Sequence, residues 1–125
     1  MKRIFFIKPL VEKMRSSDPP FVTFRRQRKS GLYMVCSGGR FHPREEGIII
    51  KVWRSCVVST SELTDQDAKD AGLSSLEELF GLFRKWYGEV PARMFKNWFV
   101  VLQPEELESQ SPGLLERKVG AGCLL

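Results

Sequence analysis

The stretch that decides the fold is Leu63–Leu79, LTDQDAKDAGLSSLEEL, which reads as two helices in direct succession. Thr64 is a good N-cap for the first helix, and Asp67 stands three residues later, where a capping box places its acidic partner. Gly72 is expected to end this helix, because glycine tolerates the left-handed conformation found just past helix ends.

The second helix of the pair is predicted over residues 74–88. Ser74 is expected to cap it, with Glu77 completing the capping box, and Gly88 is expected to end it. Between these residues the apolar side chains recur at helical spacing, which predicts one buried face. The members of this stripe, all assigned to the core, are Leu76, Leu79, Phe80, Phe83, Trp86 and Tyr87.

Strand patterns lie on both sides of these helices. Pro9, followed by spaced apolar residues, favours a short N-terminal helix to about residue 15. Apolar and alternating runs predict an α+β fold, with a polar loop at 40–47 and a bend near Arg54. The expected strands are 3–7, 21–25, 32–36, 48–60 and 94–102. We expect residues 1–103 to form one domain and residues 104–125 to form a weakly structured C-terminal tail.

Composition limits the classes of protein to consider. No apolar run in the 125 residues approaches the ~20 needed to span a bilayer, and Lys8 and Pro9 interrupt the N-terminal run too early for a signal peptide. We therefore expect a cytoplasmic protein with no membrane partner. The three cysteines lack Cys-x-x-Cys spacing and there is one histidine, so we expect no metal and no cofactor. Cys36 and Cys56 are expected to be buried.

The charge is distributed unevenly along the chain. The net charge is +5, yet residues 1–44 hold eleven Lys and Arg against two acidic residues, a net +9, whereas residues 61–90 carry a net −4. A concentrated basic region indicates a polyanionic partner. A protein-interaction domain, whose acidic helices bind a basic partner, remains an alternative.

The densest basic run is Arg25–Lys29, RRQRK. Arginine suits phosphate recognition because its planar fork makes paired hydrogen bonds. A solvated charge run at a strand edge is the alternative interpretation. The basic candidates for RNA binding are Arg25, Arg26, Arg28, Lys29, Arg40, His42 and Arg44, and the candidates around possible stacking platforms are Trp53, Lys96 and Trp98. Burial in the core is the alternative for both tryptophans.

The helical segment resembles the ASCH family of the PUA-like superfamily. Thr23-Phe24-Arg25 is similar to the family's Thr-x-Arg signature, Gly47–Lys51 to the strand before the helical insert, and Phe95–Val101 to the closing strand. The resemblance spans about Lys2 to Leu102. It implies a small β-barrel with two helices inserted between core strands, and RNA or a nucleotide-like ligand bound in a cleft that Thr23 and Arg25 line.

The resemblance also bears on catalysis. Some members of the family hydrolyse acylated cytidine, with a lysine three residues before the signature threonine and a glutamate in the first inserted helix. Here those positions hold Pro20 and Ala71. A binding module without catalysis of its own is therefore expected. An enzyme acting on modified nucleosides or RNA, with Thr23 and a displaced acid such as Asp70, is the alternative.

Overall fold

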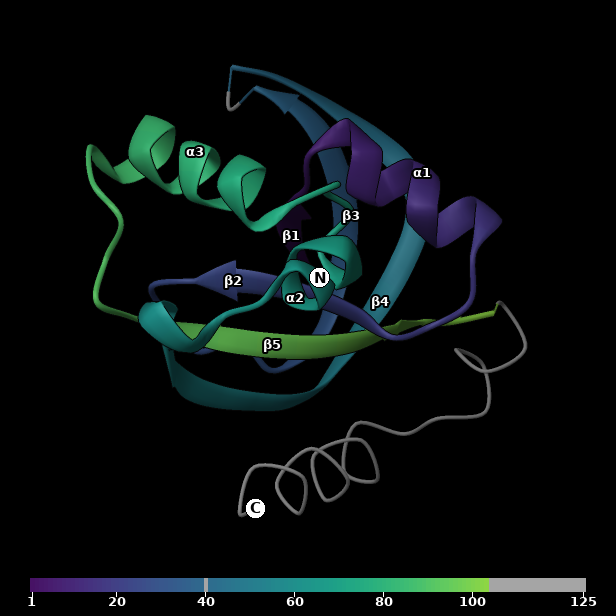
Figure 1. The fold of residues 1–125 in the computed structure, drawn as a ribbon. Helices are drawn as coiled ribbons and strands as arrows, with labels where there is room; N and C mark the ends of the chain where they lie inside the picture. The colour runs from purple at the N-terminus through teal and green to yellow at the C-terminus, as the bar shows by residue number, and fades with distance from the viewer. Residues whose placement is uncertain (40, 104–125) are drawn as a thin grey trace.

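The computed structural model describes residues 1–39 and 41–103, which form a small α+β protein with a five-stranded mixed sheet and three α-helices (Figure 1). Arg40 and the predicted tail at 104–125 lie outside the described residues. Along the chain the elements are β1 (Lys2–Phe5), α1 (Lys8–Ser16), β2 (Phe21–Arg25), β3 (Gly31–Gly39), β4 (His42–Ser59), a 3-10 turn (Thr60–Glu62), α2 (Asp65–Asp70), α3 (Leu76–Tyr87) and β5 (Arg93–Val101). The predicted N-terminal helix and the helical insert between two strands are confirmed.

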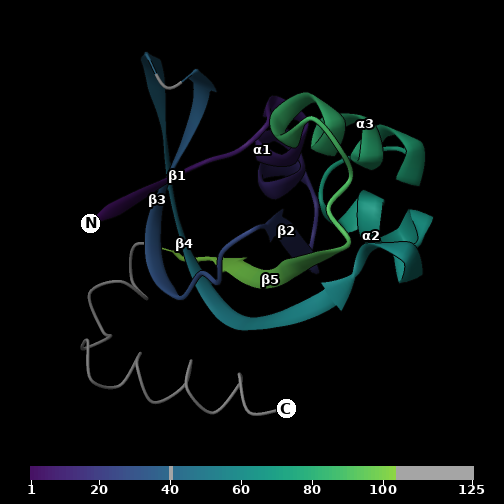
Figure 2. The ribbon, with the colours of Figure 1, turned by 90° about the vertical axis from the view of Figure 1, so that its left-hand side faces the viewer.

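The sheet has the strand order β1-β3-β4-β5-β2. The β1–β3 pair is parallel, and the other three pairs are antiparallel. Figure 2 shows the long strand β4 bending around the core. The edge strands β1 and β2 do not pair with each other, so the described residues form an open, curved sheet and not a closed barrel.

The predicted loop at 40–47 is largely strand, so that prediction is wrong. Gly39 pairs with His42 and Cys36 pairs with Glu45, which extends the β3–β4 hairpin well beyond the core. A two-stranded ribbon exposed on both faces accepts charged side chains as readily as a loop does, so polarity alone misled the prediction. The register shifts between Met34 and Cys36, and Gly47 opposite this shift has a φ of +69°.

The predicted bend near Arg54 is confirmed as a β-bulge. Val52 pairs with Phe99 and Arg54 pairs with Trp98, which leaves Trp53 as the extra residue of β4. A bulge bends its strand and increases the local twist. Here it helps β4 to curve from the β3 side of the sheet toward β5.

Two apolar clusters cover the two faces of the sheet. The first packs α1 against the concave face, and its largest fully buried side chains are Phe99, Ile50, Val11, Val35 and Val52. The second packs α2 and α3 against β2 and β5. Leu79 and Phe83 are buried in it as predicted, but Trp86 is 49% exposed, so its assignment to the core is wrong. Cys36 is fully buried and Cys56 only partly.

The caps of the inserted helices agree with the sequence except at one position. The Thr64–Asp67 capping box is present. In α3 the N-cap is Ser75, whose hydroxyl accepts a hydrogen bond from the Glu78 N–H, so the predicted cap at Ser74 is wrong by one residue. Both serines suit an N-cap, and the register of the buried stripe decides between them. Gly88 ends α3 with a φ of +80°, as predicted.

Candidate functional site

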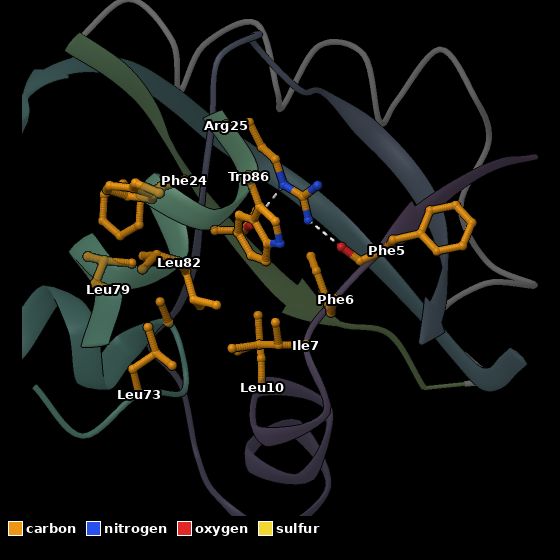
Figure 3. Close-up of a pocket in the computed structure, with 14 residues that line it drawn as sticks. Phe5, Phe6, Ile7, Leu10, Phe24, Arg25, Leu73, Leu79, Leu82 and Trp86 are labelled. Atoms are coloured by element: carbon orange, nitrogen blue, oxygen red, sulfur yellow. Dashed lines mark hydrogen bonds between the residues drawn. The ribbon is translucent and has the colours of Figure 1, made fainter. Parts of the chain in front are cut away.

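A cleft opens where α3 faces the end of β2 and the β1–α1 junction (Figure 3). Its outer part holds about 380 Å³ and is lined by Phe5, Phe6, Ile7, Lys8, Arg25, Gly38, Trp86 and Tyr87. Its narrower inner part is mostly apolar and ends against side chains that include Leu73, Leu79, Leu82 and Phe83. No Asp or Glu is among the described residues that line either part.

The guanidinium of Arg25 lies between the two edge strands of the sheet. Its Nε donates a hydrogen bond to the Thr23 hydroxyl at 3.1 Å, and an Nη donates one to the Phe5 carbonyl at 2.5 Å (Figure 3). It also lies over the Phe6 ring, 5.6 Å from the ring centroid. One side chain of β2 thus bridges to β1 where the backbones do not pair. The predicted placement of Thr23 and Arg25 in one cleft agrees with this geometry.

Arg25 has an electrostatic environment that is unusual for a partly buried cation. Burial lowers the pKa of its guanidinium, with Tyr87 acting in the opposite direction, but arginine stays charged at any physiological pH. The two groups that accept its hydrogen bonds, the Thr23 hydroxyl and the Phe5 carbonyl, are uncharged. Among residues 1–39 and 41–103, no carboxylate forms an ion pair with it. Its charge is therefore available to an anionic ligand.

Asn97 holds the back of this region together. Its side chain is fully buried; Oδ1 accepts hydrogen bonds from the Ser55 hydroxyl and from the Lys29 N–H, and Nδ2 donates to the Thr23 carbonyl at 3.3 Å. One amide therefore joins β2, β4, β5 and the turn after β2. Sequence reasoning missed this role, because a lone Asn in an apolar strand is the only signal of it.

The basic turn after β2 lies beside the cleft. Arg26 stacks on the ring of Tyr87 at 4.5 Å, and Arg28 lies 5.6 Å from the Phe95 ring; both are otherwise exposed. Burial lowers the pKa of Lys29, and the like charges of Arg25 and Lys2 lower it further. The basic side chains that follow Arg25 in the predicted run therefore lie near it, at this end of the sheet.

The other basic candidates, on the β3–β4 hairpin, do not enter the cleft. His42 and Arg44 are exposed, and the Arg44 Nε lies 3.9 Å from a Glu46 carboxylate oxygen. Gly38 of the same hairpin does line the outer cleft. The ribbon thus approaches the site, while these two side chains do not line it. Arg40, the remaining candidate of this hairpin, lies outside the described residues.

Trp53, Lys96 and Trp98 form a separate cluster that does not line the cleft. The two indole rings lie 6.5 Å apart, and the Trp98 ring is contacted by Lys96 at 4.8 Å and by the Arg54 guanidinium at 4.6 Å. Lys96 is engaged elsewhere, because its Nζ lies 2.6 Å from Asp67 Oδ1 in α2. The structure therefore does not bring these three candidates together with Arg25.

Trp86 and Lys8 belong to the cleft, although neither was predicted as a site residue. Trp86 lines both its inner and outer parts, and Lys8 lines the outer part. Trp86 is close to the end of α3, next to Arg84 and Lys85, and that polar setting was the available signal of exposure. Lys8 had no signal, since its importance follows only from the packing of α1.

The positions that the resemblance links to hydrolysis are separated. Ala71 does line the inner cleft, and there it presents a methyl group. Pro20 does not line it, and its carbonyl accepts a hydrogen bond from Lys13 Nζ at 2.9 Å. Neither Lys13 nor Asp70 lines the cleft that contains Thr23. The described residues therefore place no lysine and carboxylate together at the Thr23 hydroxyl.

Comparison with protein-family models, with curated proteins and with solved structures finds no significant match for this chain. Within the described residues, no three His, Cys, Asp or Glu side chains are grouped so that they could hold a metal ion. The helices described there are all too short or too polar to cross a membrane.

Proposed function

We propose that this protein is an RNA-binding module of the ASCH, PUA-like type, in which the cleft receives a base or nucleotide. The observation that carries the proposal is the arrangement of Thr23 and Arg25, because it places a cation with no described carboxylate partner at the mouth of an apolar pocket. An apolar pocket with a few convergent polar groups is the usual form of a small-ligand site. In this proposal the open sheet is a variant of the PUA-like barrel, in which the Arg25 side chain bridges the unpaired edge strands β1 and β2.

Aromatic and basic side chains have different roles in this proposal. Trp86 offers a half-exposed indole on which a base stacks, and such stacking contributes about 1–3 kcal/mol per base. Arg26 and Arg28 lie outside the pocket and contact phosphates of the same strand. Contacts to the phosphates along the strand position an RNA, whereas contacts to the nucleotide inside the cleft select it, so nucleotide selectivity belongs to Thr23 and Arg25.

The test is fluorescence anisotropy with short single-stranded RNAs over a series of salt concentrations. If about four phosphates are neutralised, the logarithm of affinity should fall with the logarithm of salt with a slope near −3. Replacing Arg26 and Arg28 with alanine should weaken binding to all sequences alike and flatten the slope by about one unit. Affinity that ignores salt, or that survives this double substitution unchanged, would contradict the proposal.

A further inference from the structure

The N-terminus of α1 lies at the outer cleft, and none of the described residues that line this part of the cleft is acidic. Its N-cap residue, Ile7, makes no side-chain cap, and the first turn contains no acidic residue. Ile7 and Lys8 both line the outer cleft. A helix start carries a partial positive charge that favours an anion. Pro9 has no N–H, and the Leu10 and Val11 N–H groups donate to the Ile7 carbonyl, so α1 contributes this charge rather than a set of free donors.

Arg25 is a second and independent source of positive charge at the outer cleft. Its hydrogen bonds to Thr23 and Phe5 occupy one side of the guanidinium, which carries five N–H donors in all. The remaining donors belong to a side chain that lines the outer cleft together with Lys8. A guanidinium with free donors is well suited to a phosphate group, which it can bind through two parallel hydrogen bonds.

The shape of the cleft limits how much of a nucleic acid it can admit. The outer part, at about 380 Å³, lies near the small end of ligand sites. The inner part ends against Leu73, Leu79 and Leu82, so a continuous strand cannot pass through it. The site therefore fits one nucleotide at the end of a chain, or a free one, better than an internal stretch.

From these observations we infer that the outer cleft is a site for a phosphomonoester, the terminal phosphate of an RNA strand or of a free nucleotide. This inference rests on the proposed function, since it assigns the ligand of the same cleft. A monoester carries a charge of about −1.5 to −2 at pH 7, more than the single charge of an internal phosphodiester. The helix start, Lys8 and Arg25 together match that higher charge, and Trp86 lies where the attached base can stack.

The experiment compares one RNA sequence with three kinds of end: a 5′-phosphate, a 3′-phosphate, or hydroxyls at both ends. Nucleoside monophosphates and the matching nucleosides serve as competitors. One phosphorylated end should bind about tenfold more tightly than the hydroxyl form, as expected for a few charge-assisted hydrogen bonds. This preference should shrink between pH 7 and pH 5.5, because the second ionisation of a phosphomonoester has a pKa of about 6.

Lys8→Ala should remove most of the preference for the phosphorylated end, and Arg25→Lys should reduce it while keeping the charge. Lys69→Ala is the matched control, because Lys69 is exposed on α2 and lies outside the cleft while the change in net charge is the same. RNA binding with no preference for any end overturns this inference and leaves the proposed function intact. Lys8-dependent binding of nucleoside monophosphates without RNA binding supports the inference and refutes the proposed function.

Discussion

Gly72 is the position at which the packing of the inserted helices can be tested most sharply. It has a φ of +89°, and an added Cβ would lie 2.6 Å from the Leu10 Cα and 2.8 Å from the Leu10 N. Gly88 has a similar φ of +80° with no atom within 4 Å of such a Cβ. The two glycines therefore share one backbone constraint and differ in the space around them.

Gly88→Ala should cost about 1–2 kcal/mol, the usual penalty for a left-handed conformation in a residue with a side chain. Gly72→Ala should add about 1–3 kcal/mol for overpacking, because the neighbouring atoms belong to the α1 backbone and cannot rotate away. Urea unfolding followed by circular dichroism measures both free energies. Since Ala71 and Leu73 flank Gly72 and line the inner cleft, this variant should also bind RNA less tightly.

Equal losses of unfolding free energy for the two substitutions would refute this reasoning, because they would show that the turn after α2 is not closely packed against α1. A greater loss at Gly88 would refute it too. The slope of unfolding free energy against urea should stay the same in all three proteins, which would show that the denatured state is unchanged.

Three further predictions concern stability and binding. Burial raises the pKa of Asp67, but the hydrogen bond from Lys96, the hydrogen bond from the Thr64 backbone N–H and the Lys96 charge outweigh this effect and lower the pKa below the ordinary value of an aspartate. The ion pair therefore stabilises the fold above about pH 4 and is lost as the pH falls through the lowered pKa. Asp67→Asn should cost about 1–3 kcal/mol at pH 7, and this cost should shrink as the pH falls through the lowered pKa of Asp67; a cost that does not change with pH would contradict this assignment. Phe83→Ala should cost about 3–5 kcal/mol, because its side chain is 1% exposed and truncation leaves a cavity. Trp86→Ala should lower the free energy of unfolding by under about 1 kcal/mol, as substitutions at exposed positions do, yet weaken RNA binding at least about fivefold. Thermal unfolding and a binding titration measure both effects; a larger stability loss for Trp86→Ala than for Phe83→Ala would contradict these assignments.

The sequence predicts local features of this fold better than it predicts their register. The Thr64 cap and the glycine ends of both inserted helices follow from neighbours in the chain, so they are visible before any tertiary contact forms. The N-cap of α3 depends on which apolar residues of the helix face β2. Ser74 and Ser75 are both suitable caps, so the local sequence does not decide between them. The closure of the sheet depends on how β1 and β2 approach, and no local pattern encodes that distance.

The candidate site shows the same division. Thr23, Arg25 and the basic turn are adjacent in sequence, and the structure keeps them adjacent at one end of the sheet. Lys96 and Trp98 were grouped with them by residue type alone, and the ion pair of Lys96 with Asp67 shows why type is insufficient. Trp86 was assigned to the core because its spacing fits the stripe, yet it is 49% exposed and lines the cleft instead.

The way the basic turn is anchored has a consequence for how this protein can change. The turn is held by backbone groups: the Lys29 N–H donates to Asn97, and the Ser30 N–H donates to the Tyr33 hydroxyl. Neither bond uses a charged side chain. Exchanges among the exposed arginines therefore alter what the turn attracts without altering its course. Evolution, or a protein engineer, can retune the ligand preference of this surface one charge at a time while Asn97 keeps the scaffold unchanged.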